Sequence, residues 1–175
     1  MRVLLVHNQY IQPGGEDVVA TAEGALLENY GHEVRRFIVS NRSIDRLSEK
    51  LLTAWQAPYS SRSRRRTDAH IAEFKPDVVH VHNFFPILTP SIYDACNDAA
   101  VPVVQTLHNY RLVCPQALLL RNGKPCEKCV SGSPYHAVLY GCYRGSRLVS
   151  LVPARMVSVN RQRGTWRDKV SRYIA

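Results

Sequence analysis

Three short apolar runs in this chain each lead into the dipeptide His-Asn, and this recurrence restricts the fold more than any other feature. The dipeptides are His7-Asn8, His82-Asn83 and His108-Asn109. Short runs of apolar, β-branched residues are typical of buried strands. The carboxyl ends of parallel strands share one edge of an α/β sheet, where ligands bind, so we expect the three dipeptides to converge on one polar cleft. Any one of these histidines could instead cap a strand or bond a loop carbonyl.

Helical patterns separate the predicted strands. We expect strands at residues 1–6, 32–39, 78–81 and 101–107, and a last strand at 170–175. This alternation implies parallel pairing with right-handed crossovers. The sequence therefore predicts one domain over residues 1–175, a three-layer α/β/α Rossmann-like fold with a mainly parallel sheet. A further helix is expected from Ser146, with a kink or a break at Pro153.

A glycine pair, Gly14-Gly15, lies in the turn between the first strand and the first helical pattern, whose apolar residues are Val18, Val19, Ala22, Ala25, Leu26 and Leu27. Glycines at such a turn let backbone amides approach a ligand, and a helix N-terminus favours an anion. Gly14 and Gly15 are therefore candidates for holding a phosphate or pyrophosphate. The alternative is a loop that requires positive φ. The pair fits neither the dinucleotide fingerprint nor a Walker loop, which disfavours an NAD-dependent oxidoreductase.

The chain of 175 residues carries a net charge of +9, mainly from arginine. Nucleic acid, an anionic membrane surface or a phosphorylated substrate would each suit this charge. No series of stacking aromatics accompanies the basic residues, which disfavours nucleic acid. One basic cluster comprises Arg62, Arg64, Arg65 and Arg66. This cluster is most simply a solvated helix face or loop, and the more specific alternative is a patch that faces a membrane. With no secretory leader evident, we expect a cytoplasmic protein, or one peripheral at the inner face of the membrane.

Residues 109–145 interrupt the α/β pattern and form a predicted loop insert. The insert contains four of the five cysteines, at Cys114, Cys126, Cys129 and Cys142. A C-x-x-C pair with two flanking cysteines suits tetrahedral thiolate coordination of zinc, which would brace the loop and leave no position for substrate. Reduced buried cysteines and a labile disulfide are the alternatives. No cofactor is expected for the chemistry itself.

The joint order of several motifs resembles the N-terminal half of a group 1 (family 4) glycosyltransferase of the GT-B fold. The motifs are Gly14-Gly15-Glu16, then Gly31-His32-Glu33-Val34, then residues 75–82 (KPDVVHVH), then residues 101–108 (VPVVQTLH). The resemblance implies a retaining hexosyl transfer from a nucleotide-sugar donor to a carbohydrate or lipid-linked acceptor, as in polysaccharide biosynthesis. It implies that His108 is the catalytic histidine beside the transferred sugar. Gly14 and Gly15 would lie by the donor phosphates or the acceptor.

Five further polar residues of the three dipeptides complete the candidate substrate site: His7, Asn8, His82, Asn83 and Asn109. The C-terminal donor-binding domain of the family, with its paired glutamates, is absent from these 175 residues, so we expect this half alone to be inactive. The missing domain would act in cis or in trans. The competing hypothesis is a non-catalytic binding or assembly domain, zinc-braced or not, that docks on a membrane or on a separate donor-domain chain.

Overall fold

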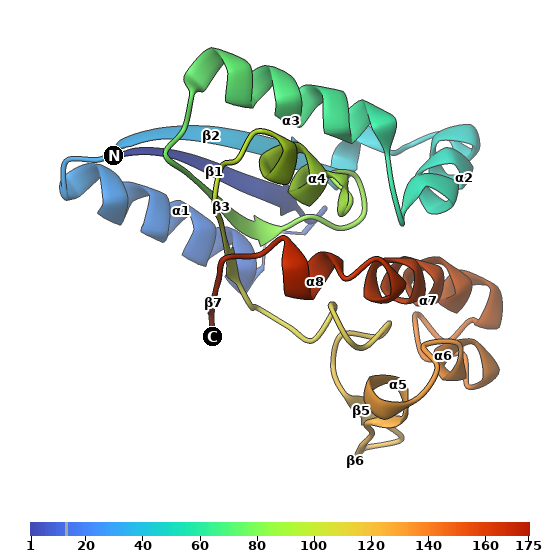
Figure 1. Cartoon of the computed structure of the whole chain (residues 1–175). Coiled ribbons are helices and arrows are strands. Elements are labelled where there is room, and N and C mark those ends of the chain that lie inside the picture. Colours follow the sequence, from blue (N-terminus) through green and yellow to red (C-terminus); the bar gives the residue numbers. More distant parts are fainter. Residues whose placement is uncertain (13) are drawn as a thin grey trace. The chain divides into compact units, whose positions relative to one another are not determined.

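The computed structural model describes residues 1–12 and 14–175 (Figure 1). The chain forms two compact units. The sheet unit comprises Met1–His108 and Arg167–Ala175, and the cysteine unit comprises Asn109–Trp166. The second unit begins where the loop insert was expected and continues beyond residue 145.

The sheet unit is built on five parallel strands, which confirms the predicted fold class. The strands lie in the order β2-β1-β3-β4-β7, and each neighbouring pair is parallel. Their bounds are β1 Arg2–Gln9, β2 Glu33–Ser40, β3 Val78–Asn83, β4 Val103–Thr106 and β7 Arg172–Ile174. The apolar runs recognised in the sequence occupy the centre of this sheet, where Leu4, Val6, Val79 and Val81 are fully buried.

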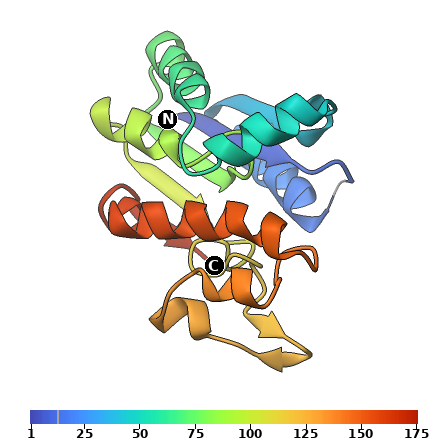
Figure 2. The same cartoon turned by 90° about the vertical axis from the view of Figure 1, so that its right-hand side faces the viewer.

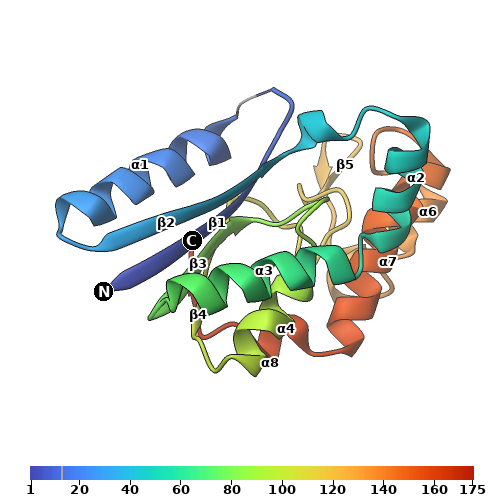
Figure 3. The ribbon, with the colours of Figure 1, turned by 90° about the horizontal axis from the view of Figure 1, so that it is seen from above.

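Helices cover both faces of the sheet, which gives the three layers. Helix α1 (Gly15–Asn29) lies on one face, and α3 (Ser61–Phe74) lies on the other, packed against α4 (Ser91–Asp98) (Figure 3). The basic cluster at residues 62–66 lies on the first turns of α3, which begins after Ser60, because the Ser60 side chain accepts a hydrogen bond from the Ser63 N–H and caps the helix. Three further elements are a 3-10 turn (Asn41–Ser43), α2 (Leu47–Gln56) and α8 (Thr165–Asp168).

Helix α1 places its small and acidic residues against the sheet. Its buried positions are Asp17, Ala20 and Gly24, whereas Val18 is 67% exposed. A Cβ added at Gly24 would lie 3.3 Å from Leu5 Cδ1, so the glycine permits close packing of α1 on β1. The apolar residues of the sequence pattern therefore do not mark the inward face. The sheet surface beneath α1 carries polar histidines, which a carboxylate-bearing face complements.

The cysteine unit has little regular structure apart from one long helix. It contains a two-stranded hairpin, β5 (Leu120–Arg121) with β6 (Lys124–Pro125), and two single-turn helices, α5 (Lys128–Ser131) and α6 (His136–Leu139). Helix α7 (Arg147–Gln162) packs against α6 (Figure 2). The predicted break at Pro153 is wrong, because α7 continues through this buried residue.

In the described part of the chain, no helix combines the length and the apolar character that crossing a bilayer requires.

Candidate functional site

Four histidines gather beside α1 at the carboxyl end of the sheet. His7 comes from β1, His80 and His82 from β3, and His108 follows β4. The ring centroid of His82 lies 6.1 Å from that of His7, 4.4 Å from that of His80 and 5.3 Å from that of His108. The strand order explains this, because β3 lies between β1 and β4. His80 and His82 share one face of β3, since side chains two apart on a strand point to the same side.

Helix α1 supplies two carboxylates to these histidines. Asp17 Oδ1 lies 2.8 Å from His7 Nε2, and Asp17 Oδ2 accepts a hydrogen bond from the Gly14 N–H at 2.7 Å. Glu23 Oε2 lies 3.4 Å from His82 Nε2 and 3.5 Å from His80 Nε2. Asp17 therefore ties the glycine turn to β1, and Glu23 faces both histidines of β3.

Three histidines of this cluster, His80, His82 and His108, are held neutral at neutral pH. Burial, with smaller effects of His80, His108 and His7, lowers the pKa of His82 to about 3. Burial, with a smaller effect of His108, lowers the pKa of His80 to about 4. Burial also lowers the pKa of His108, although the nearby Glu16 opposes this shift. Neutral imidazoles present one N–H and one lone pair each, which suits hydrogen bonding to hydroxyl groups.

A line of contacts runs from Glu23 through His82 to His108. His82 Nδ1 lies 3.1 Å from His108 Nε2, so these two nitrogens share one proton in a hydrogen bond. The side chain of His82 is 0% exposed, and its Nε2 faces Glu23 without forming a hydrogen bond. His108 is only half-buried. Of the four histidines, His108 is therefore the one that reaches solvent, and the buried ones support it.

The asparagines of the His-Asn dipeptides are engaged elsewhere. Asn8 Oδ1 accepts a hydrogen bond from the Ile87 N–H at 2.9 Å, and Asn8 Nδ2 donates to Asn41 Oδ1 at 2.8 Å. Asn83 Nδ2 donates to the Asn8 carbonyl at 2.8 Å. Asn8 and Asn83 are buried and organise the loops after β1 and β3. Asn109 belongs to the cysteine unit, where its Oδ1 accepts a hydrogen bond from the Arg111 N–H.

The glycine pair begins α1 with open space around it. Gly14 has extended backbone angles, with φ −122°, and positive φ is found at neither Gly14 nor Gly15. A Cβ added to either residue would meet no atom within 4 Å. Positive φ is therefore not the reason for these glycines. The first turn of α1 also carries Glu16 and Asp17, whose negative charges oppose the binding of an anion at the helix N-terminus.

Two groups of side chains in the chain suit a metal ion by type. In the described part of the chain, the ligand atoms of Glu23, His80 and His82 are the only three that lie within 4.8 Å of one another. However, His80 Nε2 is already 2.8 Å from Thr106 Oγ1. The predicted zinc ligands lie together in the cysteine unit, with Cys114 and Cys129 buried and Cys126 and Cys142 half-buried, and all four are free thiols.

Three residues of this site were not among the sequence candidates: Asp17, Glu23 and Thr106. The signal for the two carboxylates was their position on α1. Asp17, Ala20 and Gly24 recur at helical spacing, and a stripe of small residues beside a carboxylate indicates a helix face that packs on something polar. His80 was not a sequence candidate for the site either; it is buried and is part of the cluster.

An all-parallel α/β sheet with polar side chains at the carboxyl ends of its strands is the arrangement of ligand-binding α/β enzymes. Residues 13–140 match Glycosyltransferase Family 4, and this stretch covers most of the chain. The chain therefore belongs to glycosyltransferase family 4, as its sequence motifs indicated. No curated protein matches it.

Proposed function

We propose that this chain is the N-terminal, acceptor-binding half of a retaining glycosyltransferase. The enzyme would move a sugar from a nucleotide-sugar donor to a carbohydrate or lipid-linked acceptor. Membership of the family supports sugar transfer. The observation that carries the acceptor role is that half-buried His108 lies 3.1 Å from the buried, neutral His82 and is the histidine of the cluster that reaches solvent.

The charges of the site favour a hydroxyl group over a diphosphate. In the described part of the chain, the side-chain carboxylates of Asp17 and Glu23 form ion-pair contacts with histidines only. Because His80 and His82 stay neutral at neutral pH, they do not offset the charge of the Glu23 carboxylate. A diphosphate would be repelled here, whereas a sugar hydroxyl can donate to a lone pair and accept from an N–H. The cations that hold a leaving diphosphate would come from the donor-binding domain.

The carboxylate of Glu23 sets the direction of the hydrogen bonds. With Glu23 ionised, the single proton of His82 is favoured on Nε2, which faces the carboxylate. His82 Nδ1 then accepts a hydrogen bond from His108 Nε2–H across their 3.1 Å contact. This leaves the lone pair of His108 on Nδ1, where it can accept the proton of a hydroxyl group.

In the resulting mechanism, this chain orients the acceptor. His108 accepts a hydrogen bond from a sugar hydroxyl and holds it in one direction for the reaction. Glu23 and His82 keep the imidazole in a single tautomer, and the Asp17–His7 contact fixes the glycine turn beside it. The open space at Gly14 and Gly15 lets the sugar approach the first turn of α1.

The test compares two probes by saturation-transfer difference NMR on the 175-residue chain. A panel of uncharged octyl hexopyranosides is expected to give signals that disappear in His108→Ala and persist in His32→Gln, a control outside the cluster. Uridine diphosphate is expected to give no signal that depends on His108. Binding of the diphosphate in place of every hexoside would overturn the acceptor assignment.

Contact with a membrane is a separate proposal that rests on the net charge of +9. The arginine cluster on α3 is partly engaged, because Arg64 pairs with Asp68 and Asp98, and Arg66 lies over the ring of Phe37. We expect weak flotation with anionic vesicles at low salt that disappears at physiological salt. No association at low salt would exclude it.

A further inference from the structure

The cysteine unit has few of the features that hold a small unit together. Its strands have two residues each, and two of its helices have four. Several of its non-glycine residues have left-handed backbone angles, with φ between 50° and 71°: Ala117, Leu119, Asn122 and Arg144. Such conformations cost free energy and persist only where surrounding contacts fix them. Small, loop-rich units with little core usually depend on disulfides or a metal.

The four cysteines of this unit each lie in a hydrogen-bonded turn. The Cys114 carbonyl accepts from the Ala117 N–H at 2.9 Å, and the Cys126 N–H donates to the Leu119 carbonyl at 2.8 Å. The Cys142 N–H donates to the Ala137 carbonyl at 2.9 Å, and Cys129 lies in the single turn of α5. The left-handed residues Ala117 and Leu119 are thus the ones that hold the backbone of two cysteines.

The four thiols also act on one another electrostatically. Burial raises the pKa of Cys129 to about 11, and Cys114, Cys142 and Cys126 each add to this shift. Burial, with further effects of Cys114 and Cys126, raises the pKa of Cys142. These mutual effects agree with the placement of all four cysteines in one compact unit. None of the four is in a disulfide.

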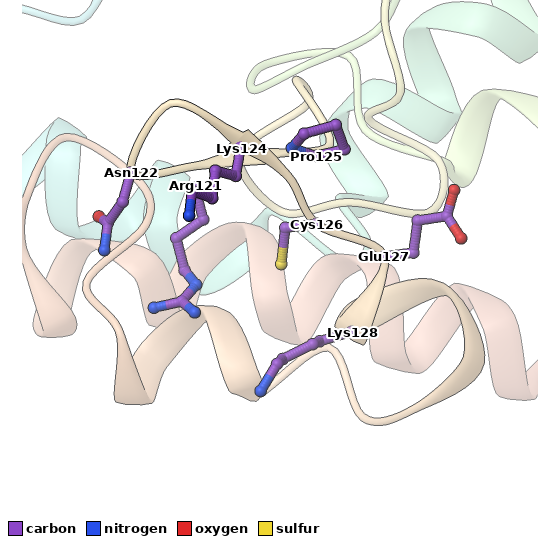
Figure 4. Close-up of a pocket in the computed structure, with 7 residues that line it drawn as sticks. All are labelled: Arg121, Asn122, Lys124, Pro125, Cys126, Glu127 and Lys128. Atoms are coloured by element: carbon purple, nitrogen blue, oxygen red, sulfur yellow. The ribbon is translucent and has the colours of Figure 1, made fainter.

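The surroundings of this group are cationic. Figure 4 shows the sulfur of Cys126 on the side of the hairpin toward which Arg121 and Lys128 extend, whereas Glu127 points away. Lys124 lines the same pocket. Arg121 and Lys128 both lie over the ring of Tyr140, at 4.3 and 5.5 Å, which fixes the hairpin and α5 beside α6. Nearby cations favour the thiolate form of cysteine and offset negative charge.

We propose that Cys114, Cys126, Cys129 and Cys142 bind one structural zinc ion as four thiolates and that this ion braces the cysteine unit. Zinc with four thiolates carries a charge of about −2, which Arg121, Lys124 and Lys128 would balance. No position is left open for a substrate, so the role is structural. The proposal does not depend on the proposed acceptor site, which lies in the sheet unit.

Metal binding would draw the sulfurs closer together. In a tetrahedral site with Zn–S distances of about 2.3 Å, neighbouring sulfurs are about 3.8 Å apart. No three of the four sulfurs lie within 4.8 Å of one another at present. The proposed site therefore requires side-chain rotation, which the two half-buried cysteines, Cys126 and Cys142, can undergo more readily than the buried ones.

The decisive experiment is metal analysis combined with X-ray absorption on the full chain, purified without chelators. We expect about one zinc ion per chain and a first shell of sulfur at about 2.3 Å. A first shell at about 2.0–2.1 Å would place the zinc on nitrogen and oxygen, as at Glu23, His80 and His82, and would refute the cysteine site. Less than about a tenth of an equivalent, an iron–sulfur chromophore, or a disulfide among these cysteines would also refute it.

Variants separate the zinc from the fold and from the acceptor site. Cys126→Ser with Cys129→Ser is expected to lose the zinc, whereas Cys96→Ala, a change at the fifth cysteine on α4, is expected to retain it. Because the double substitution also removes two buried or half-buried side chains, the unsubstituted chain is treated with a chelator as a second test. Removal of zinc is expected to raise amide exchange within residues 109–166 and to leave hexoside binding at His108 unchanged. Unchanged exchange after complete removal would contradict a bracing role.

Discussion

At the scale of single residues, burial and not charge governs the histidine cluster. Each imidazole lies close to a carboxylate or to another imidazole, yet desolvation is the largest influence on the pKa of His80, His82 and His108. When the pH falls, protonation of a buried imidazole is unfavourable, because the charged ring lacks the hydration that it has in the unfolded chain. The cluster therefore couples the stability of the sheet unit to pH.

Stability should fall as the pH is lowered from 6.5 toward 5. The unfolded chain protonates His80 and His82 near their ordinary pKa of 6.5, whereas the folded chain does so only near 4 and 3. Between these values the unfolded state binds more protons, so folding stability rises with pH. Two such groups give a slope of up to roughly 3 kcal/mol per pH unit. Burial raises the pKa of Glu23, which acts in the opposite sense, so we choose the window above pH 5.

Urea denaturation at pH 7, 6 and 5 measures this slope. His82→Asn should reduce the dependence on pH by about half, because one of the two buried imidazoles is removed. His32→Gln, outside the cluster, should leave it unchanged. Equal slopes in all three proteins would show that the cluster is not the source.

At the scale of the elements, the strands were predictable and the roles of α1 were not. A strand signals itself through local apolar composition, and a parallel order follows from the alternation of strands with helices. His82 lies between His7 and His108 because β3 lies between β1 and β4 in the sheet, and only the fold determines this strand order. For the same reason Glu23 was missed, because its partners lie 57 and 59 residues away along the chain, at His80 and His82. Asn8 and Asn83 point away from the histidine side chains beside them, since neighbours on a strand face opposite sides.

A buried hydrogen-bond network connects α4 to the strand that carries His82. The fully buried Tyr93 hydroxyl donates to Gln105 Oε1, and Gln105 Nε2 donates to the His82 carbonyl at 3.2 Å. Tyr93→Phe leaves Gln105 Oε1 without this donor, so we expect a loss of about 1–3 kcal/mol in the free energy of unfolding. Tyr30→Phe, a matched change at a residue 77% exposed, should alter it by less than about 0.5 kcal/mol. Equal changes in the free energy of unfolding for the two variants, measured by urea denaturation, would show that this network does not stabilise the fold.

At the scale of the whole molecule, these 175 residues contain one Rossmann-like sheet, which carries the proposed acceptor site. Family membership could be recognised from the sequence because it rests on the joint order of motifs that the strands and turns preserve. The organisation of the cysteine unit could not, because its few regular elements are short and its backbone depends on side chains distant in the chain. The spacing of its cysteines nevertheless predicted the four residues that are proposed as zinc ligands.

The chain alone should show no measurable sugar transfer. Binding energy at the leaving diphosphate is a large part of catalysis in group transfer, and the carboxylates around His108 do not supply it. Release of nucleotide from UDP-glucose and GDP-mannose, with octyl hexopyranosides as acceptors, should stay at the level of a His108→Ala control. Turnover that depends on His108 would show that the donor site is already present within these residues.

The most direct test of the central claim is a long-range 15N–1H spectrum of the histidine rings, recorded during titration with an octyl hexopyranoside. The account predicts neutral rings for His82 and His108 at pH 7, with the proton of His108 on Nε2. It also predicts that the hexoside shifts the resonance of His108 Nδ1 first, and that Glu23→Gln weakens the tautomer preference of both rings. Independent rings that titrate near pH 6.5 and do not respond to any hexoside would contradict it.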